Sequence, residues 1–250
     1  GASGAGKSVV LRLILGLLRP DSGTIRVDGQ HIDHLKEREL MRIRAGIGMM
    51  FQENALFDSL TVLENVGYRL YEETDMPKPQ VRRRVEEVLG FMGLEDYIDR
   101  MPAELSGGQR RRVAIARAMA AKPHLLLFDD PTAGLDPMGE YRMMEILTRL
   151  NRESGVTIVM ATHSVDLVPV FLSRLHILSR GRLVRSGTPE EVFGNRDELA
   201  GVKLRLPYIA ELIHQLKSGD SLPFRRVPLT VGEARRDILE AFGARPHAQQ

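Results

Sequence analysis

The first eight residues, Gly1-Ala2-Ser3-Gly4-Ala5-Gly6-Lys7-Ser8, constrain the chain more than any other stretch. They follow the pattern of a glycine, four residues and Gly-Lys-Ser. In that pattern glycines let backbone N–H groups surround a phosphate, the lysine neutralises it and the hydroxyl binds Mg²⁺. An apolar helix expected over Ser8–Leu18 would add the positive end of its dipole to the same phosphate. The alternative, a flexible glycine turn before an apolar helix, is the weaker interpretation. The stretch predicts a phosphate-binding loop.

Composition limits the kinds of protein that fit this loop. A chain of 250 residues with 43% hydrophobic residues can build one large domain, or one domain and a small appendage. The absence of cysteine excludes a disulfide framework, a thiol nucleophile and a cysteine-bound zinc site. The net charge of +2 comes without a dense basic tract, so we expect no nucleic-acid partner. The apolar run Leu13–Leu18 is far shorter than the roughly 20 residues that cross a bilayer.

Apolar runs further along the chain predict an α/β fold with a mainly parallel core sheet. Leu125–Phe128 and Thr157–Met160 are continuous apolar runs, as in strands buried on both faces, and a helix expected over Met138–Arg152 joins them. A phosphate loop normally follows a buried strand, so we expect N-terminal strands to be missing ahead of residue 1. The shorter elements expected are strands over Thr24–Val27 and Ile47–Phe51, a hairpin turn at Asp28-Gly29, a helix over Asp33–Ile43, and a hairpin of His176–Leu178 and Arg182–Val184.

Two further segments are predicted to be helical. Residues 53–120 form a helical insertion, in which Arg82-Arg83-Arg84 is interpreted as a solvated helix face rather than a site for a polyanion. We expect the main domain to cover residues 1–195 and a C-terminal helical appendage to cover residues 196–250. The appendage is predicted to contain the helices Tyr208–Leu216 and Glu233–Phe242, and Thr230 with Glu233 fits a capping box.

Polar side chains follow the predicted parallel strands. Asp129 and Asp130 come directly after Leu125–Phe128, at the edge where α/β proteins bind ligands. Beside a phosphate loop, Asp129 would hold Mg²⁺ through water and Asp130 would face the attacking water, although two such acids can also cap a helix. Gln52 and His163 end two other strands, where Gln52 would meet Mg²⁺ or the attacking water and His163 would hydrogen-bond a γ-phosphate. A lone histidine there is more often structural.

A second anion-binding feature is Leu105-Ser106-Gly107-Gly108-Gln109, which opens a helix expected to run to about Ala120. Two glycines after a serine at a helix N-terminus form a nest of backbone N–H groups. One helix start cannot share a phosphate that the first loop already surrounds. A plain helix cap explains Ser106 but not Gly107 and Gly108 together.

Taken together, these motifs resemble the nucleotide-binding domain of ATP-binding cassette (ABC) transporters over roughly residues 1–195. The resemblance implies a phosphate-loop NTPase fold of ABC type, with a small antiparallel part and a helical insertion that carries the signature Leu-Ser-Gly-Gly-Gln. It implies a homodimer, or a pair of ATPase subunits, with two ATP molecules between them. Transmembrane permease subunits would be further partners, at the cytoplasmic side of the plasma membrane.

The resemblance also implies roles for individual residues. Lys7 and Ser8 would bind phosphate and Mg²⁺, Asp129 would serve the metal, and Gln52 would sense the metal and lead into the surface that meets the membrane subunits. Ser106, Gly107, Gly108 and Gln109 would close on the ATP of the partner, Asp136 would communicate across the dimer, and His163 would act as a switch. The adenine-stacking aromatic residue of the family would lie upstream of residue 1.

Asp130 departs from the family pattern, because glutamate is usual at this position. The carboxylate is one methylene shorter, which removes about 1.5 Å of reach. Our hypothesis is that Asp130 is still the general base and that the chain is a functional ATPase.

Several stretches bear on the transported cargo. Asn54–Val66 and the Asp-Asp pair resemble ATPases of the phospholipid-trafficking Mla system, which makes lipid transport our main prediction. Val165–Pro169 and the appendage from Gly201 instead resemble ATPases of cobalt and nickel uptake, so uptake of a metal ion or another small solute is the alternative. An ABC ATPase of translation or DNA repair fits less well, because the chain has one such domain and no sustained heptads.

Overall fold

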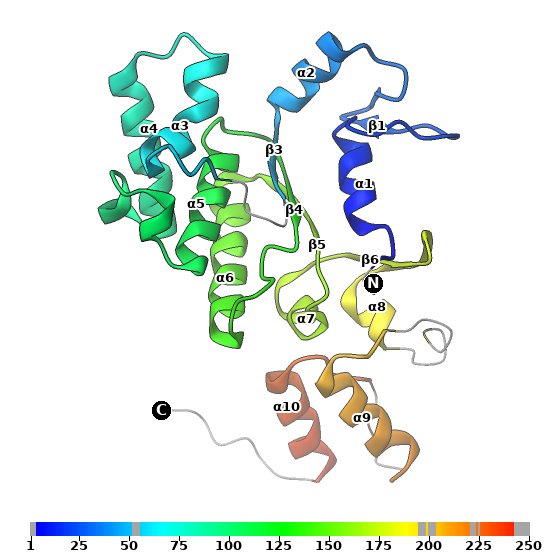
Figure 1. The fold of residues 1–250 in the computed structure, drawn as a ribbon. Helices are drawn as coiled ribbons and strands as arrows, with labels where there is room; N and C mark the ends of the chain where they lie inside the picture. The colour runs from blue at the N-terminus through cyan, green and yellow to red at the C-terminus, as the bar shows by residue number, and fades with distance from the viewer. Residues whose placement is uncertain are drawn as a thin grey trace. The chain divides into compact units, whose positions relative to one another are not determined.

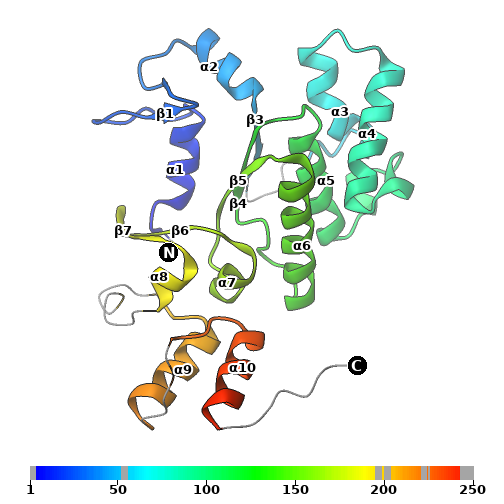
Figure 2. The same cartoon turned by 180° about the vertical axis from the view of Figure 1, so that it is seen from behind.

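The computed structural model describes residues 4–51, 56–194, 199, 204–220, 224 and 226–242. They belong to two compact units. Lys7–Thr162 is named here the core unit, and Gly1–Gly6 with His163–Gln250 is named the C-terminal unit. Figure 1 labels their helices and strands, and Figure 2 shows the same elements from behind. Among the described residues, no helix combines the length and the apolar character needed to span a membrane.

The core unit is built on a parallel sheet. Its strands β3 (Ile47–Met50), β4 (Leu125–Asp129) and β5 (Thr157–Ala161) lie in the order β3-β4-β5. Ile47 pairs with Leu125, and Leu125 pairs with Thr157, so the three strands start level with one another. The apolar middle of β4 is fully buried. The predicted parallel arrangement is confirmed. The prediction that both apolar runs are buried on both faces is correct for β4 and wrong for β5, in which Val159 is 38% exposed.

Helices cover both faces of this sheet. In Figures 1 and 2 the strands lie between α1 (Lys7–Ile14) on one side and α5 (Gly107–Met119) and α6 (Pro137–Ser154) on the other. Helix α1 packs on β4 and β5, α5 packs on β3, and α6 packs on β5. One buried cluster joins α1 and the sheet to the segment between them in the chain, and it consists of Leu11, Leu15, Val27, Ile32, Leu40, Ile47, Leu127 and Ala161.

Helix α1 ends earlier than its apolar run, which continues to Leu18. Gly16 takes a left-handed conformation (φ +63°), and its N–H donates to the Leu13 carbonyl at 2.9 Å. The Leu17 N–H donates to the Arg12 carbonyl, also at 2.9 Å. This pattern of backward hydrogen bonds stops a helix, because it satisfies the last carbonyl groups. The apolar residues after Ile14 therefore belong to a turn.

A small hairpin follows, formed by β1 (Arg26–Val27) and β2 (Gln30–His31), with both turn residues at positive φ as a tight primed turn requires. Helix α2 (Glu37–Ala45) begins later than the predicted start at Asp33. Oδ1 of Asp33 instead accepts the Ile25 N–H at 3.0 Å, so this residue belongs to the turn that supports the hairpin. Its pKa lies below the ordinary value because of that hydrogen bond.

The helical segment of the core unit consists of α3 (Val62–Glu73), α4 (Lys78–Met92), the 3₁₀ turns η1 (Glu95–Tyr97) and η2 (Pro102–Glu104), and α5. Helices α3, α4 and α5 pack on one another. Arg84 donates to the carbonyls of Met119 and Ala120 at 3.0 and 2.9 Å and so caps the end of α5. Arg82 pairs with Glu86 on the exposed side. These contacts give the arginine run a structural role.

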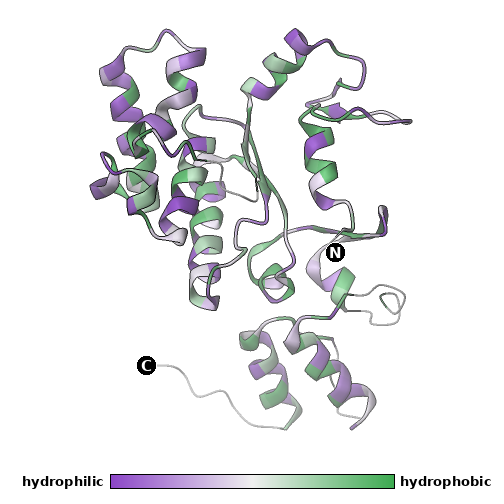
Figure 3. Ribbon diagram, viewed as in Figure 1, coloured by the Kyte–Doolittle hydropathy of each residue, from purple (hydrophilic) through white to green (hydrophobic). Residues whose placement is uncertain are grey.

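The C-terminal unit contains short elements around an apolar cluster. They are η3 (Val165–Leu167), α7 (Val168–Phe171), β6 (Leu175–Ser179), β7 (Arg182–Gly187), α8 (Pro189–Phe193), α9 (Tyr208–Ser218) and α10 (Val231–Ala241). The predicted β6–β7 hairpin is confirmed, and so is the capping box of Thr230 and Glu233 at the start of α10. Figure 3 shows apolar and polar residues alternating along α9 and α10, as expected of amphipathic helices.

Candidate functional site: a nucleotide site at the sheet edge

The first helix points its N-terminus toward the carboxyl edge of the core sheet. Arg44, which lies just before the start of β3, donates to the carbonyls of Leu15 and Gly16 at 2.8 and 3.1 Å. The end of α1 is therefore fixed at the amino edge of the sheet. Because α1 packs along β4 and β5, its first residues, Lys7 and Ser8, lie toward the carboxyl edge. This places a cation, a hydroxyl and a positive helix end on that side.

The same edge carries the two predicted carboxylates. Asp129 is the last residue of β4, pairs with Ala161 of β5 and is 7% exposed. Asp130 follows at φ +57°, a left-handed conformation that aspartate tolerates better than most residues. Its N–H donates to the Ala161 carbonyl at 2.9 Å, and its carbonyl accepts the Ala133 N–H at 3.2 Å. The backbone turn after β4 thus holds Asp130 in a fixed position at the strand end.

Arg111 is a residue of this region that the sequence analysis missed. It lies on α5 and is 8% exposed, and its Nη1 donates to the Ala133 carbonyl in the turn after Asp130. Burial lowers its pKa, while the charge of Asp130 acts in the opposite direction. Arg111 therefore connects the signature helix with the acidic turn. Its spacing could have revealed it: Arg111 lies on the same helix face as Ile115 and Ala118, which are buried, so the pattern predicts a buried arginine.

The signature residues cap their own helix. The N-cap of α5 is Ser106, whose Oγ accepts the Gln109 N–H at 3.3 Å, while Oε1 of Gln109 accepts the Ser106 N–H at 2.8 Å. Gly107 has nothing within 4 Å of the place where a Cβ would stand, and Gly108 is also open apart from Leu135 at 3.7 Å. The first turn of α5 can therefore be approached closely by another molecule.

A hollow of about 420 Å³ lies beside that first turn, between α5 and α6. Ser106, Gly108 and Gln109 form part of its lining. Three arginines, Arg112, Arg142 and Arg149, form another part, together with one acidic residue, Glu145, and an apolar floor. The excess of positive charge makes this hollow suited to an anionic ligand.

Asp136 begins α6 as its N-cap. Its side chain accepts the Gly139 N–H at 2.7 Å, and Pro137 occupies the first helical position. Asp136 is exposed, so its carboxylate is accessible from solvent as well as bonded to the helix. Its predicted part in communication across a dimer stays a prediction.

Other predicted site residues belong to the C-terminal unit or lie outside the described residues. Gly4 and Gly6 take left-handed conformations (φ +74° and +99°), as the backbone of a phosphate loop requires, and the Ala5 carbonyl accepts the Gly181 N–H at 3.2 Å. His163 is exposed at the start of the C-terminal segment. The predicted site residues outside the described part of the chain are Gly1, Ala2, Ser3 and Gln52.

An exposed aromatic pair stands on the helical segment. The rings of Phe57 and Tyr68, 43% and 39% exposed, lie with centroids 4.7 Å apart, and the guanidinium carbon of Arg117 lies 5.7 Å from the Phe57 ring. Asn65 is fully buried. It accepts the Phe57 N–H at 2.8 Å and donates to the carbonyls of Phe57, Leu60 and Thr61. The amide of Asn65 thus fixes the loop that presents Phe57.

The residues at the carboxyl edge of the sheet can bind Mg²⁺ if a phosphate group supplies some of its ligands. Mg²⁺ prefers oxygen ligands and is commonly held by one or two carboxylates together with substrate phosphates. Ser8 and Asp129 offer such oxygens from the core unit. Among the described residues, no group of three or more His, Cys, Asp or Glu side chains could hold a metal alone. The donor set therefore suits a nucleotide-bound Mg²⁺ better than a resident metal ion.

Comparison with known proteins agrees with this geometry. A family model described as ABC transporter matches residues 1–133. A putative ABC transporter ATP-binding protein of Geobacter sulfurreducens is 51% identical over 242 residues, which cover 96% of this chain and 85% of that protein. An energy-coupling factor transporter ATP-binding protein of Clostridium perfringens, EcfA3, is 38% identical over 240 residues, covering 95% of this chain and 83% of that protein.

A solved structure gives the same result for the fold. The dimeric structure of a bacterial ABC transporter cassette superposes with a TM-score of 0.69 at 38% identity, and covers 75% of this chain and 82% of that one. The parallel sheet with helices on both faces and small antiparallel parts is the ABC type of phosphate-loop ATPase fold. The chain belongs to the ABC transporter family, as one of its ATP-binding subunits.

Proposed function

We propose that this chain hydrolyses ATP to drive an importer of a small solute, of the energy-coupling factor type. Support comes from EcfA3 of Clostridium perfringens, which matches 95% of the chain. The relatives reported above give no support to lipid transport, which was the main prediction from sequence, and favour the alternative of a small-solute importer. We further propose residues 1–195 as the ATPase domain and residues 196–250 as an appendage.

The observation that carries the ATPase proposal is the meeting of α1 and β4 at one sheet edge. Lys7 and Ser8 begin the helix there, and Asp129 and Asp130 end the strand there. In the proposed site Lys7 neutralises the phosphates, and Ser8 and Asp129 hold Mg²⁺, with Gln52 as a further contact. The metal would supply neutralisation of charge on the transferred phosphoryl group. Asp130 accepts the proton of the attacking water, and His163 binds the γ-phosphate.

The signature helix is proposed to serve a nucleotide held by a second copy. The open first turn of α5 and the arginine-lined hollow beside it offer N–H groups and positive charge to an anion that arrives from outside the core unit. Asp136 lies at the start of α6, whose residues line the same hollow, and is the proposed contact across the dimer. A permease subunit is proposed to dock on the exposed pair of Phe57 and Tyr68. No nucleic-acid partner is proposed.

The catalytic part of this proposal is tested by Asp130→Asn. The amide has nearly the same size as the carboxylate but accepts no proton, so we expect kcat for ATP to fall at least about 100-fold while ATP binding is kept. Asp21→Asn, at an exposed turn, is the matched control and keeps full activity. If Asp130→Asn hydrolysed ATP at the control rate in the assembled complex, Asp130 would not be the base.

The transport part is tested by identifying what the ATPase drives. The natural full-length protein, purified with its membrane subunits and placed in lipid vesicles, is expected to take up a small solute such as a divalent metal ion in an ATP-dependent way. A phospholipid-transfer assay with the same vesicles is the comparison. ATP-dependent movement of fluorescent phospholipid without solute uptake would contradict the importer proposal.

A further inference from the structure

One carboxylate fastens the segment leading into α9 to the turn that follows His163. Asp166 lies in η3, and its Oδ1 accepts Nη1 of Arg205 at 3.2 Å and the backbone N–H of Tyr208 at 2.8 Å. Nη2 of Arg205 donates to Oδ2 of the same carboxylate. The guanidinium carbon of Arg205 also lies 4.1 Å from the centroid of the Tyr208 ring. We name this set of contacts the Asp166 clamp.

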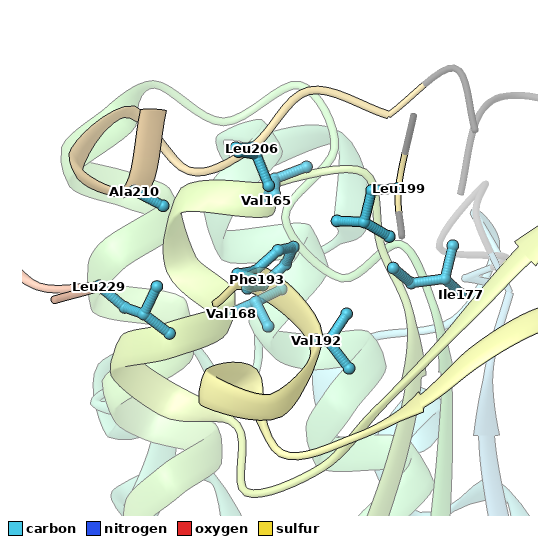
Figure 4. Packing of buried hydrophobic residues seen from close by; sticks show 9 residues of the cluster. All are labelled: Val165, Val168, Ile177, Val192, Phe193, Leu199, Leu206, Ala210 and Leu229. Carbon is cyan, nitrogen blue, oxygen red and sulfur yellow. The ribbon is translucent and has the colours of Figure 1, made fainter. Parts of the chain in front are cut away.

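The other side of the η3 turn is held by apolar packing. Val165 and Val168, which flank Asp166 in the chain, belong to the buried cluster of the C-terminal unit together with residues of α8 and α9. Figure 4 shows Val165 close to Leu206, the residue next to Arg205 in the chain. The turn is thus fixed from both sides by the C-terminal helices and the segment before them, through apolar contacts on one side and the Asp166 clamp on the other.

Only two residues, Ser164 and Val165, separate His163 from Asp166. Because one residue spans at most about 3.6 Å, the backbone of His163 stays within about 11 Å of the clamp. Val165 is 8% exposed and cannot leave the buried cluster without exposing apolar surface. Because His163 is joined to Val165 by Ser164 alone, a displacement of η3 also displaces the backbone of His163.

We propose that Asp166 is a positioning residue for His163, and that the appendage sets the place of His163 through the Asp166 clamp. The inference rests on the proposed role of His163 toward the γ-phosphate. It gives the C-terminal helices a part in ATP hydrolysis, because loss of the clamp frees the turn that carries the histidine. Catalytic groups lose much of their rate advantage when misplaced by about 1 Å.

The competing explanation is that the ion pair only fastens the helices. Arg205 and Asp166 have side chains that are 49% and 38% exposed, and ion pairs at such sites contribute little to stability. A merely structural pair would change stability slightly and leave catalysis unchanged. The two explanations therefore differ in kcat and in the environment of His163.

The first experiment measures steady-state ATP hydrolysis by the full-length protein with its membrane subunits. Asp166→Asn keeps the size of the side chain and an acceptor for the Tyr208 N–H, but removes the charge that pairs with Arg205. We expect kcat to fall about 5- to 10-fold with KM for ATP within about twofold. Arg205→Gln should lower kcat by the same factor. The double variant should be no slower than either single variant, because all three lose the same interaction between Asp166 and Arg205.

The matched control is another ion pair of the same unit. Arg226 lies 3.4 Å from Asp237 of α10, with its side chain 60% exposed, and neither residue contributes to the Asp166 clamp. Arg226→Gln is expected to keep kcat within about 1.5-fold of the parent. If Asp166→Asn does not fold, Arg205→Gln carries the test, because its half-exposed position tolerates the change.

The second experiment observes His163 directly. Its imidazole C–H signal in an NMR spectrum, assigned with the variant His163→Gln, should shift in Asp166→Asn and Arg205→Gln but not in Arg226→Gln. If the His163 signal does not shift in Asp166→Asn and Arg205→Gln, the inference is overturned, whatever the value of kcat. A moved signal with unchanged kcat keeps the positioning of His163 and instead refutes its proposed role in hydrolysis.

Discussion

Replacing Asn65 by alanine should loosen the loop that presents Phe57. The side chain is 0% exposed and makes one accepted and three donated hydrogen bonds to the backbone of residues 57–61. An amide nitrogen carries only two hydrogens, so the three carbonyls share them. We therefore count about three full bonds of about 1 kcal/mol each, which predicts a loss of about 3 kcal/mol in local stability.

Hydrogen exchange at the Leu60 amide measures this loss. Its N–H donates to the Phe57 carbonyl at 3.1 Å, a backbone bond that Asn65→Ala keeps, so its exchange reports the opening of the loop. A loss of about 3 kcal/mol corresponds to roughly a 100-fold fall in the protection factor, because each 1.4 kcal/mol is tenfold. Protection of amides in the middle of α5 should stay unchanged, since those bonds lie within the helix.

Asn151→Ala is the matched control for this measurement. Nδ2 of Asn151 donates a single bond, to the Val156 carbonyl at 2.8 Å. Its replacement should therefore cost about 1 kcal/mol or less, and reduce protection near Val156 by no more than about fivefold. If Asn65→Ala and Asn151→Ala lowered local protection equally, the buried amide would not be what fixes the loop, and the counting of bonds above would be refuted.

Two further outcomes follow from the structure. Gly48→Ala should destabilise the core unit by about 2–3 kcal/mol in urea titrations, because the added Cβ would lie 2.3 Å from the Ala118 carbonyl oxygen. Gly232→Ala is the control: a Cβ there would meet open space beside α10, so this change should be neutral or slightly stabilising. Burial raises the pKa of Asp166, but the Arg205 and Tyr208 hydrogen bonds outweigh it and hold the pKa below 3.8. The stabilisation from this depressed pKa is present above about pH 4 and lost as the pH falls through the folded value, so melting curves of the parent and Asp166→Asn should converge in acid.

Local signals in the sequence were sufficient for the elements that depend on local chemistry. The continuous apolar runs Leu125–Phe128 and Thr157–Met160 correctly predicted parallel strands. The burial on both faces that they also predicted holds for β4 but not for β5, in which Val159 is 38% exposed. Thr230 and Glu233 predicted a helix start because their reciprocal bonds involve neighbours in sequence. Likewise, the phosphate-loop and signature motifs identified the family because their spacing is short and fixed.

Contacts between distant residues were not predictable in this way. The end of α1 depends on Arg44, and the clamp on Asp166 depends on Arg205, which lies 39 positions away. The spacing of Arg111 from Ile115 indicates a buried side chain, but it does not reveal the partner, which is the Ala133 carbonyl 22 positions away. In each case a charged side chain takes its role from a partner that only the folded chain brings near it.

The capping of α5 bears on how the proposed dimer can separate after hydrolysis. Ser106 and Gln109 satisfy each other's backbone N–H groups at the start of the helix. The N–H groups of Gly107 and Gly108 have no partner within the helix, because they belong to its first turn, and the two glycines leave that turn open. A γ-phosphate can therefore accept from these two groups, at about 1.5–3 kcal/mol per charge-assisted bond, without displacing the cap. Once the phosphate leaves, the cap still holds the start of the helix. A reversible grip of this kind suits a cycle in which two copies must close on ATP and then part.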